Sequence, residues 1–335
     1  MLLNQTTISG IGAALPEQIV TNRDLTQVID TSETFIVERT GVLTRRQASV
    51  ETSVSDLAVE AAEQAIRSAG IAKEEIGFVL FNTITPDHHD PGTVYFFQEK
   101  LGINGCAAID LRGQCSGFLY GVAIADQFVR CATYDHVLVI GAELLSKRRD
   151  NSLEGRNLAI LLGDGAGAAI VSNRNKGLFR ILHFRLGADG KHADALWTKA
   201  PGSGQGEKFL SANDMETGQH HFRMNGHIIF EQAVEKMTMV ARQILADTGC
   251  TLDDIDWCVP HQANLRLIEG MSQALGLPMN KILTNVEQVG NTASASIPIM
   301  LHQALGTGHL QSGNKVLLVS FGGGLVWAGM LVEIV

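Results

Sequence analysis

The chain contains 335 residues, of which 45% are hydrophobic and 18% charged, and it carries 35 glycines and a formal net charge of −9. This composition excludes a disordered chain and a coiled coil, and the length allows two joined halves or one large α/β unit. The negative charge, a pI near 5.6 and the short basic clusters argue against a nucleic-acid partner. No segment approaches the ~20 apolar residues of a membrane helix, so we expect a cytoplasmic protein without membrane contact.

The first half of the chain alternates strand and helix patterns. A strand is predicted over 76–83, a helix over 93–100 and a second strand over 107–111. The turn Gly113-Gln114-Cys115-Ser116-Gly117 then leads into a helix over 118–130, and a further strand is predicted over 135–141. Cys115 is therefore expected at a strand-to-helix turn.

A glycine-rich segment, 163–167, lies between predicted strands over 158–162 and 168–171. A nucleotide-binding loop would have to open a helix whose N-terminus holds the phosphate, and no helix pattern follows here. The segment 322–324 similarly lies between apolar strands ending at Ser320 and running over 325–334. Both segments are interpreted as tight turns between strands.

The second half repeats the element order of the first. A strand over 255–260 leads to His261, and a helix over 265–275 and a strand over 281–286 follow. The turn at Asn291 then precedes a helix over 293–305 and a strand over 315–320. We therefore predict a duplicated α/β fold with halves 1–175 and 176–335, in which Cys115 and Asn291 occupy equivalent places. Because such sheets place their sites beyond the carboxyl ends of strands, Cys115, His261 and Asn291 are expected to meet.

Most other cysteines and basic residues suggest no special site. The five cysteines form no C-x-x-C pair and are odd in number, which argues against disulfides and a zinc site. The adjacent histidines 88–89 and 220–221 are interpreted as turn and surface residues, without a metal. The basic cluster 147–149 is interpreted as a solvated loop. Four cysteines are interpreted as inert core residues: Cys106, Cys131, Cys250 and Cys258.

Cys115, His261 and Asn291 together suggest acyl transfer. A cysteine at a helix N-terminus is expected to have a lowered pKa and to act as a nucleophile. A thioester can pass its acyl group to such a thiol, and a malonyl-type thioester that loses CO₂ then supplies an enolate. The imidazole of His261 and the amide of Asn291 can donate hydrogen bonds to the enolate oxygen, which removes the need for a metal or organic cofactor. The N–H groups of Cys115 and of a glycine in 322–324 are candidates for the oxyanion hole.

Several motifs in order resemble the β-ketoacyl-acyl carrier protein synthase III family of thiolase-fold condensing enzymes. The resemblance spans nearly the whole chain, and the segments that carry it are 31–41, 114–117, 163–167, 261–266, 290–291 and 321–324. It implies a duplicated five-layer αβαβα thiolase fold, a homodimer, and acyl-CoA and malonyl-CoA or malonyl-acyl carrier protein as substrates. It assigns a catalytic triad to Cys115, His261 and Asn291, and a second oxyanion donor to Gly323.

The resemblance also implies a coenzyme A site. Phe35 would stack on adenine, Arg39 and Arg156 would lie near the phosphates, and Asn264 would order the active-site histidine and water. The segments 85–91, 146–148, 155–158 and 186–190 are especially similar to PqsD-like members of the family, which condense anthraniloyl-CoA with a malonyl thioester in alkylquinolone signal biosynthesis. That reaction is an alternative to lipid and fatty acid biosynthesis.

Two departures from the family pattern concern the substrates. The chain has Asp90-Pro91-Gly92 where ordinary members carry Phe-Pro-Ser, which suggests an altered starter group. Glu231, Glu269 and Gln273 stand where carrier-protein users tend to have lysines, which favours free coenzyme A thioesters.

Other classes of condensing enzyme fit less well. A thiolase would need a second cysteine in the segment 320–322, and an elongating synthase would have a second histidine in place of Asn291. A plant-type chalcone synthase shares the three residue types, but its chain is usually longer. A non-catalytic binding protein of the same fold would be expected to lose the nucleophile, and Cys115 is present.

Overall fold

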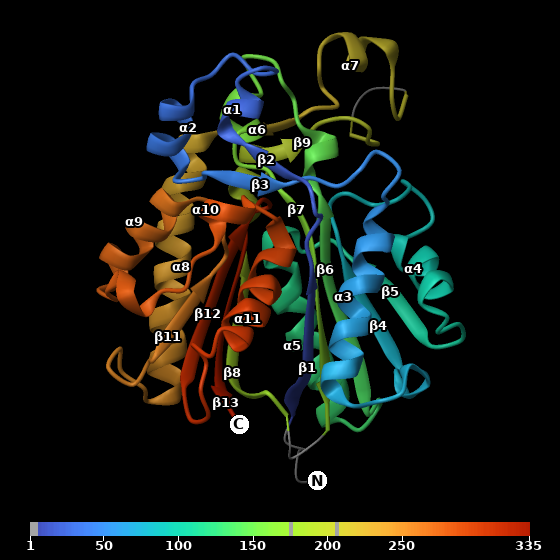
Figure 1. The fold of residues 1–335 in the computed structure, drawn as a ribbon, viewed down its shortest axis with the longest axis vertical. Helices are drawn as coiled ribbons and strands as arrows, with labels where there is room; N and C mark the ends of the chain where they lie inside the picture. The colour runs from blue at the N-terminus through green and yellow to red at the C-terminus, as the bar shows by residue number, and fades with distance from the viewer. Residues whose placement is uncertain (1–5, 174–176, 205–207) are drawn as a thin grey trace.

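The computed structural model describes residues 6–173, 177–204 and 208–335. Nine strands of this part of the chain form one mixed sheet in the order β11-β12-β13-β8-β1-β7-β6-β4-β5. The sheet has two parts, because β1 and β8 pair only through Thr7 with Arg180 and Ile8 with Phe179. This short junction lets the two parts diverge and receive helices between them (Figure 1).

The first part of the sheet is built around strands that are buried on both faces. It consists of β1 (Thr7–Ala14), β4 (Phe78–Asn82), β5 (Ala107–Leu111), β6 (His136–Leu144) and β7 (Asp164–Ser172). All residues of β6 and β7 are buried, as expected for strands covered by helices on both sides. The outer face packs against α3 (Val54–Ala69) and α4 (Thr93–Leu101).

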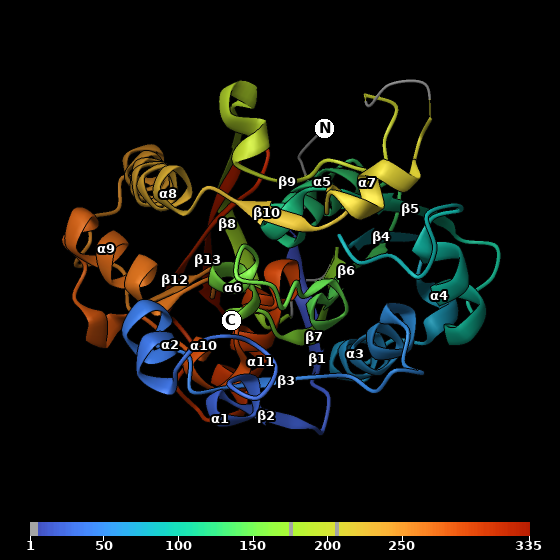
Figure 2. The same cartoon turned by 90° about the horizontal axis from the view of Figure 1, so that it is seen from above.

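The second part of the sheet consists of β8 (Phe179–Ala188), β11 (Trp257–Pro260), β12 (Lys315–Gly322) and β13 (Val326–Ile334). Its outer face packs against α8 (Gly226–Thr248) and α9 (Leu265–Leu275). Between the two parts lie α5 (Gly117–Arg130) and α11 (Ser296–Gly306), whose apolar residues share one core with strands of both parts. The layers therefore follow the predicted αβαβα order, which Figure 2 shows from above.

Shorter elements close one end of these layers. They are β2 (Ile19–Thr21), α1 (Asn22–Leu25), α2 (Glu33–Thr40), β3 (Thr44–Arg46), α6 (Arg156–Ala159), β9 (Leu196–Thr198), α7 (Ala212–Glu216), β10 (Phe222–Met224) and α10 (Val286–Val289). In Figure 1 the labelled ones lie toward the upper end of the molecule, opposite the C-terminus. Arg45 of β3, 1% exposed, joins two of these elements by donating to the carbonyl of Ile160, which directly follows α6, at 2.8 Å.

Most predicted elements are confirmed, and two begin and end where the sequence placed them, namely β5 and α9. Three predictions are wrong. The expected strand over 281–286 is a 3₁₀ turn followed by a single bridge between Ile282 and Cys258. The segment 158–162 belongs partly to α6, and the glycine-rich segment 163–167 runs into β7 instead of forming a turn, because glycines there allow close approach of the central helix. A Cβ at Gly167 would lie 2.5 Å from Pro298 of α11.

Two expectations about solvent exposure are also wrong. Only Lys147 of the basic cluster is exposed, whereas Arg148 and Arg149 are half-buried. Cys131 is exposed, because it follows the last turn of α5 instead of lying in the core.

Candidate active site

The three sequence-predicted catalytic residues line one pocket. Cys115, His261 and Asn291 meet there although they lie on three distant segments, and the pocket volume is about 110 Å³. Most of the remaining wall is apolar and includes Leu145, Leu162, Leu196, Phe222, Met224, Ile229, Phe230 and Phe321. The pocket therefore combines three chemically active side chains with a lining suited to an acyl chain.

Asn82 holds the turn that carries Cys115. This amide, fully buried at the end of β4, accepts a hydrogen bond from the Gly113 N–H at 2.8 Å and donates to the Gln114 carbonyl at 3.2 Å. Gln114 has φ +50°, a left-handed conformation that few residues other than glycine adopt. A Cβ at Gly117 would lie 1.8 Å from the Asn82 side-chain oxygen, so glycine is required where α5 begins. Sequence analysis missed Asn82, and a polar residue ending an apolar strand was the available signal.

The turn that matches the Cys115 turn in the second half is centred on Ser294. Gln114–Ser116 is a 3₁₀ turn followed by α5, and Ala293–Ala295 is a 3₁₀ turn followed by α11. Each turn begins with a left-handed residue, since Ala293 has φ +43°. Asn291 lies three residues before Ser294, so the expected equivalence of Cys115 and Asn291 is wrong by three positions, although both line the pocket.

Burial controls the charge of the nucleophile. It raises the pKa of the Cys115 thiol to about 12, the nearby Glu143 adds to this effect, and a hydrogen bond from the cysteine's own backbone lowers the pKa by less. The sequence-based expectation of a lowered pKa is therefore wrong for the unliganded protein, because desolvation outweighs the helix N-terminus. A thiol in this setting needs a proton acceptor when it attacks.

His261 is a neutral imidazole that is held from one side. The residue is 3% exposed, and burial lowers the pKa of its side chain to about 4. The ring Nδ1 lies 2.8 Å from the Ser296 hydroxyl, which also accepts a hydrogen bond from the Gln262 N–H at 3.3 Å. Since Nδ1 is engaged, Nε2 is the ring nitrogen left for a substrate.

Asn291 lines the pocket with a side-chain oxygen that is already hydrogen-bonded. Its side-chain oxygen accepts a hydrogen bond from the Ala293 N–H at 2.8 Å, and its backbone N–H donates to the Leu161 carbonyl at 2.7 Å. The oxygen is thus engaged within the turn, whereas the side-chain nitrogen donates to no group among the described residues. Asn291 is therefore oriented as a hydrogen-bond donor.

Gly322, rather than Gly323, packs directly against the nucleophile. A Cβ at Gly322 would lie 2.8 Å from the Cys115 backbone nitrogen, and a Cβ at Gly323 would lie 2.7 Å from the Leu196 carbonyl oxygen. Gly322 lines the pocket, and Gly323 lines the adjoining cavity. The close approach of these two turns requires glycine, while the oxyanion role of Gly323 stays a prediction.

Glu143 is a buried carboxylate that sequence analysis also missed. It accepts hydrogen bonds from the Ser294 hydroxyl at 2.9 Å, the Ile84 N–H at 3.0 Å and the Thr85 hydroxyl at 3.0 Å. Burial raises its pKa to about 7, although these hydrogen bonds act in the opposite direction. Glu143 thus ties β6 to the loop after β4 and to the Ser294 turn.

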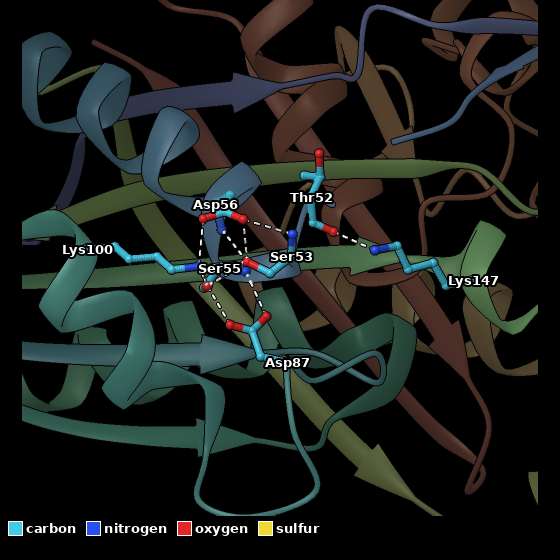
Figure 3. Close-up of polar contacts among 7 residues, drawn as sticks. All are labelled: Thr52, Ser53, Ser55, Asp56, Asp87, Lys100 and Lys147. Carbon is cyan, nitrogen blue, oxygen red and sulfur yellow. Dashed lines mark hydrogen bonds and ion pairs between the residues drawn. The ribbon is translucent and has the colours of Figure 1, made fainter. Parts of the chain in front are cut away.

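A polar network fixes the loop that contributes Ile84 to the pocket wall (Figure 3). Asp87 accepts hydrogen bonds from the backbone N–H and the hydroxyl of Ser55 at the start of α3. Lys100 of α4 forms an ion pair with Asp56 at 2.6 Å, and Lys147 donates to the Thr52 carbonyl at 2.6 Å. Asp87 therefore fastens this loop to the start of α3, and the other two contacts fix α4 and Lys147 to the same N-terminal end of α3.

The predicted coenzyme A residues gather at the cap. The guanidinium groups of Arg156 and Arg39 lie 4.8 and 5.7 Å from the centre of the Phe35 ring, within the range of cation–π contacts. Asn264 lines the pocket and donates to the Arg39 carbonyl at 3.3 Å. The four residues thus form a continuous path from the cap to the pocket.

The described residues contain neither a membrane-spanning helix nor a metal-binding cluster. No helix in 6–173, 177–204 or 208–335 has the length and apolar character of a membrane span. No group of three or more His, Cys, Asp or Glu side chains in the same part of the chain is arranged to hold a metal ion. The expected cytoplasmic location stays a prediction.

The layer order and the three convergent side chains are those of a thiolase-fold condensing enzyme. Models of the family 3-oxoacyl-[acyl-carrier-protein] synthase III match residues 109–190, and those of its C-terminal domain match residues 245–334. A β-ketoacyl-[acyl-carrier-protein] synthase III of Rhizorhabdus wittichii is 38% identical, covering 99% of this chain and 100% of the relative. One of Clostridioides difficile is 41% identical, covering 97% of both chains.

Solved structures agree with these relatives. A 3-oxoacyl-[acyl-carrier-protein] synthase III from Aquifex aeolicus has a TM-score of 0.87 at 36% identity, covering 98% of this chain and 99% of the other. The priming β-ketosynthase of the R1128 polyketide pathway has a TM-score of 0.88 at 30% identity, covering 99% of this chain and 97% of the other. The chain belongs to the β-ketoacyl-acyl carrier protein synthase III family and is an acyl-transferring condensing enzyme of fatty acid biosynthesis type. These comparisons favour neither the anthraniloyl alternative nor a non-catalytic protein.

Proposed function

We propose that Cys115 takes an acyl group from an acyl-CoA and passes it to a malonyl thioester by decarboxylative Claisen condensation. The observation that carries this proposal is the meeting of Cys115, His261 and Asn291 in one largely apolar pocket. The acyl-CoA would enter past Phe35, Arg39, Arg156 and Asn264, of which Asn264 lines the pocket and the other three are joined to it by contacts in the cap. Both thioesters are substrates, and no cofactor is needed.

In the first half-reaction, Nε2 of neutral His261 accepts the Cys115 proton as sulfur attacks the thioester carbonyl. The acyl–sulfur bond to coenzyme A breaks, and the proton passes to the departing thiolate, which leaves as the free thiol. The Cys115 N–H and the Gly323 N–H stabilise the oxyanion. A pKa of about 4 for His261 leaves the imidazole unprotonated at neutral pH, so a ring nitrogen is free to take the proton as it passes from Cys115 to the leaving group.

In the second half-reaction, the malonyl thioester loses CO₂, and its enolate oxygen receives hydrogen bonds from Nε2–H of His261 and from the Asn291 amide. The enolate carbon attacks the acyl-enzyme, and the Cys115 thiolate leaves and regains a proton from water. His261 must therefore act as an acceptor first and a donor later. The Ser296 hydroxyl fits both tautomers, because it can accept from Nδ1–H or donate to Nδ1.

The proposal extends to assembly and organisation. The halves 1–175 and 176–335 would supply the nucleophile and the two donors, respectively, with a boundary that falls at 174–176, outside the described residues.

The strand β5 ends the sheet order and exposes 47% of Ile109, so its free edge is suited to pairing with a second copy in a homodimer. Acidic residues Glu231 and Glu269 favour malonyl-CoA over an acidic carrier protein as donor.

Intact-protein mass spectrometry after incubation with acetyl-, octanoyl- and anthraniloyl-CoA tests the proposal. We expect a single acyl adduct on Cys115 from at least one of the first two thioesters. Selective labelling by anthraniloyl-CoA would transfer the assignment to the PqsD-like reaction. The absence of any adduct would contradict the role of Cys115.

A further inference from the structure

A second cavity of about 380 Å³ adjoins the catalytic pocket. The two share four lining residues, Ile84, Gln114, Leu196 and Phe222. The second cavity is also lined by Arg112, Arg148 and His89, together with Thr198 and Trp197, and none of its lining residues is acidic. In a chain with a net charge of −9, a cavity beside the nucleophile that is lined by two arginines and no carboxylate requires an explanation.

Arg148 is held at the boundary between the two cavities. Its Nη1 donates to the Ile84 carbonyl at 3.1 Å, its Nη2 donates to the Thr198 hydroxyl, and its guanidinium lies 4.7 Å from the centre of the Phe222 ring. These partners are all uncharged, so the half-buried cation has no ion pair among the described residues. Contacts with Ile84 and Phe222 place it against the wall that also lines the catalytic pocket.

Arg112 adds a second positive charge to this cavity. It lies three residues before Cys115, and neither a hydrogen bond nor an ion pair to its side chain is found in the described part of the chain. It acts electrostatically on Arg148, which shows that the two cations are near enough to repel each other. Two such charges in one cavity are stabilised when an anion binds between them.

The nearby carboxylates already accept hydrogen bonds from other groups of the protein. Glu143, which acts on Arg148, accepts hydrogen bonds from Ile84, Thr85 and Ser294. Asp110, which acts on Arg112, accepts hydrogen bonds from two backbone N–H groups at the start of α4, at 2.7 and 2.8 Å. The protein therefore supplies no free carboxylate of its own to this pair within the described residues.

The cavity lies away from the residues proposed to bind coenzyme A. Asn264, which contacts Arg39 in the cap, belongs to the catalytic pocket but not to the cationic cavity. Gly323 and Gln114, which flank the nucleophile, do line the cationic cavity. A group bound there would therefore belong to the acyl part of the substrate and not to the phosphates.

We propose that Arg112 and Arg148 bind a carboxylate at the far end of the starter acyl group, so that the enzyme accepts an ω-carboxyacyl-CoA. This inference rests on the proposed acyl transfer to Cys115. The chain between the two ends of the starter would pass Ile84, Leu196 and Phe222. The far carboxylate takes no part in the reaction and contributes only to selection, because charged hydrogen bonds to arginine discriminate against a neutral end group.

The test compares glutaryl-CoA with its neutral ω-amide, which has nearly the same size and shape. We expect the wild-type enzyme to acylate Cys115 with a kcat/KM about 10- to 100-fold higher for glutaryl-CoA, the range for hydrogen bonds to a charged group. Acetyl-CoA is included as a starter that cannot reach the arginines. Equal values for the acid and the amide would overturn the inference, whatever the variants do.

Variants then assign the preference to the cavity. Arg148→Met and Arg112→Met should each reduce the ratio of acid to amide by about tenfold. Arg67→Met removes an exposed arginine on α3 and should keep the wild-type ratio. The Arg112 variant keeps the test decisive if the Arg148 variant fails to fold. An unchanged ratio in the Arg112 or Arg148 variant would contradict the proposal. Weaker self-association together with an unchanged ratio would assign the arginines to an interface instead.

Failure of this inference differs from failure of the proposed function. If acetyl-CoA labels Cys115 but the carboxylate brings no advantage, acyl transfer stands and the cationic cavity does not bind the starter. If no thioester labels Cys115, both ideas fall.

Discussion

The two 3₁₀ turns at the centre of the molecule have the same backbone form but different chemistry. Cys115 follows the left-handed Gln114 and lines the pocket, whereas Ser294 follows the left-handed Ala293, is 1% exposed and donates to Glu143. Both lead into central helices of the same layer. The comparison teaches that the turn shape itself does not create a nucleophile, because the open space in front of the side chain decides whether it reacts or anchors.

Replacing Cys115, the residue at the centre of the reactive turn, should have the largest effect on activity. Cys115→Ala should abolish acyl-enzyme formation and lower condensation by about 10³-fold or more, because no other group can carry the acyl intermediate. Intact-protein mass spectrometry with acetyl-CoA checks the first effect. Cys131→Ala, which changes an exposed cysteine, should label as the wild type does. An adduct of normal yield on the Cys115 variant would show that the nucleophile lies elsewhere.

The two donors should separate the half-reactions. His261→Ala and Asn291→Ala should lower decarboxylation of the malonyl thioester by about 10²- to 10³-fold, because each removes a donor to the enolate oxygen. Asn291→Ala should still form the acyl-enzyme at nearly the wild-type rate, while His261→Ala should form it more slowly. Release of ¹⁴CO₂ from labelled malonyl-CoA and mass spectrometry measure the two steps. Normal CO₂ release by either variant would refute its assigned role.

Loss of Asn82 should disturb the reactive turn more than its counterpart. Asn82→Ala leaves the Gly113 N–H and Gln114 carbonyl without their partner, which should cost about 1–3 kcal/mol of unfolding free energy. We also expect acylation of Cys115 to slow by about tenfold as the turn relaxes. Urea unfolding and acylation kinetics measure these effects. Asn82→Ser, which keeps a polar group, should recover part of the rate. An unchanged acylation rate in Asn82→Ala would contradict a positioning role.

Glu143, which accepts a hydrogen bond from the Ser294 turn, should make the unfolding free energy depend on pH. Its pKa rises from an ordinary 4.5 to about 7 in the folded protein, so the folded state holds the proton more tightly than the unfolded state. The associated stability is fully present below pH 4.5 and is lost as pH rises through 7, by about 3 kcal/mol at most. The wild type should therefore lose stability relative to Glu143→Gln over this interval.

Urea unfolding of both proteins from pH 4.5 to 8 measures the difference in their unfolding free energies. His261, whose lowered pKa acts in the opposite direction, is present in both proteins, so its contribution cancels in the difference. Parallel stability curves would show that Glu143 does not titrate in this range.

Much of this architecture could be predicted from the sequence. Alternating strand and helix patterns placed β5 and α9 within their bounds, and the duplicated order brought Cys115, His261 and Asn291 to one place. The pKa of Cys115 could not be predicted, because desolvation depends on what surrounds the sulfur in three dimensions. Glu143 and Ser296 were missed because their partners are distant in sequence, whereas Asn82 was missed although a polar residue ending an apolar strand was a signal. The strand over 281–286 failed because a single bridge to Cys258 replaces a ladder.

A pulse–chase experiment on Cys115 tests the central claim most directly. The enzyme is loaded with acetyl-CoA or, if it is the better starter, glutaryl-CoA, freed of excess thioester and mapped by peptide mass spectrometry. Malonyl-CoA, or malonyl-acyl carrier protein in a parallel sample, is then added. We predict that the adduct lies on Cys115 and disappears in step with one equivalent of CO₂ and one of β-ketoacyl thioester. An adduct on another residue, or one on Cys115 that persists with either malonyl donor, would contradict the account.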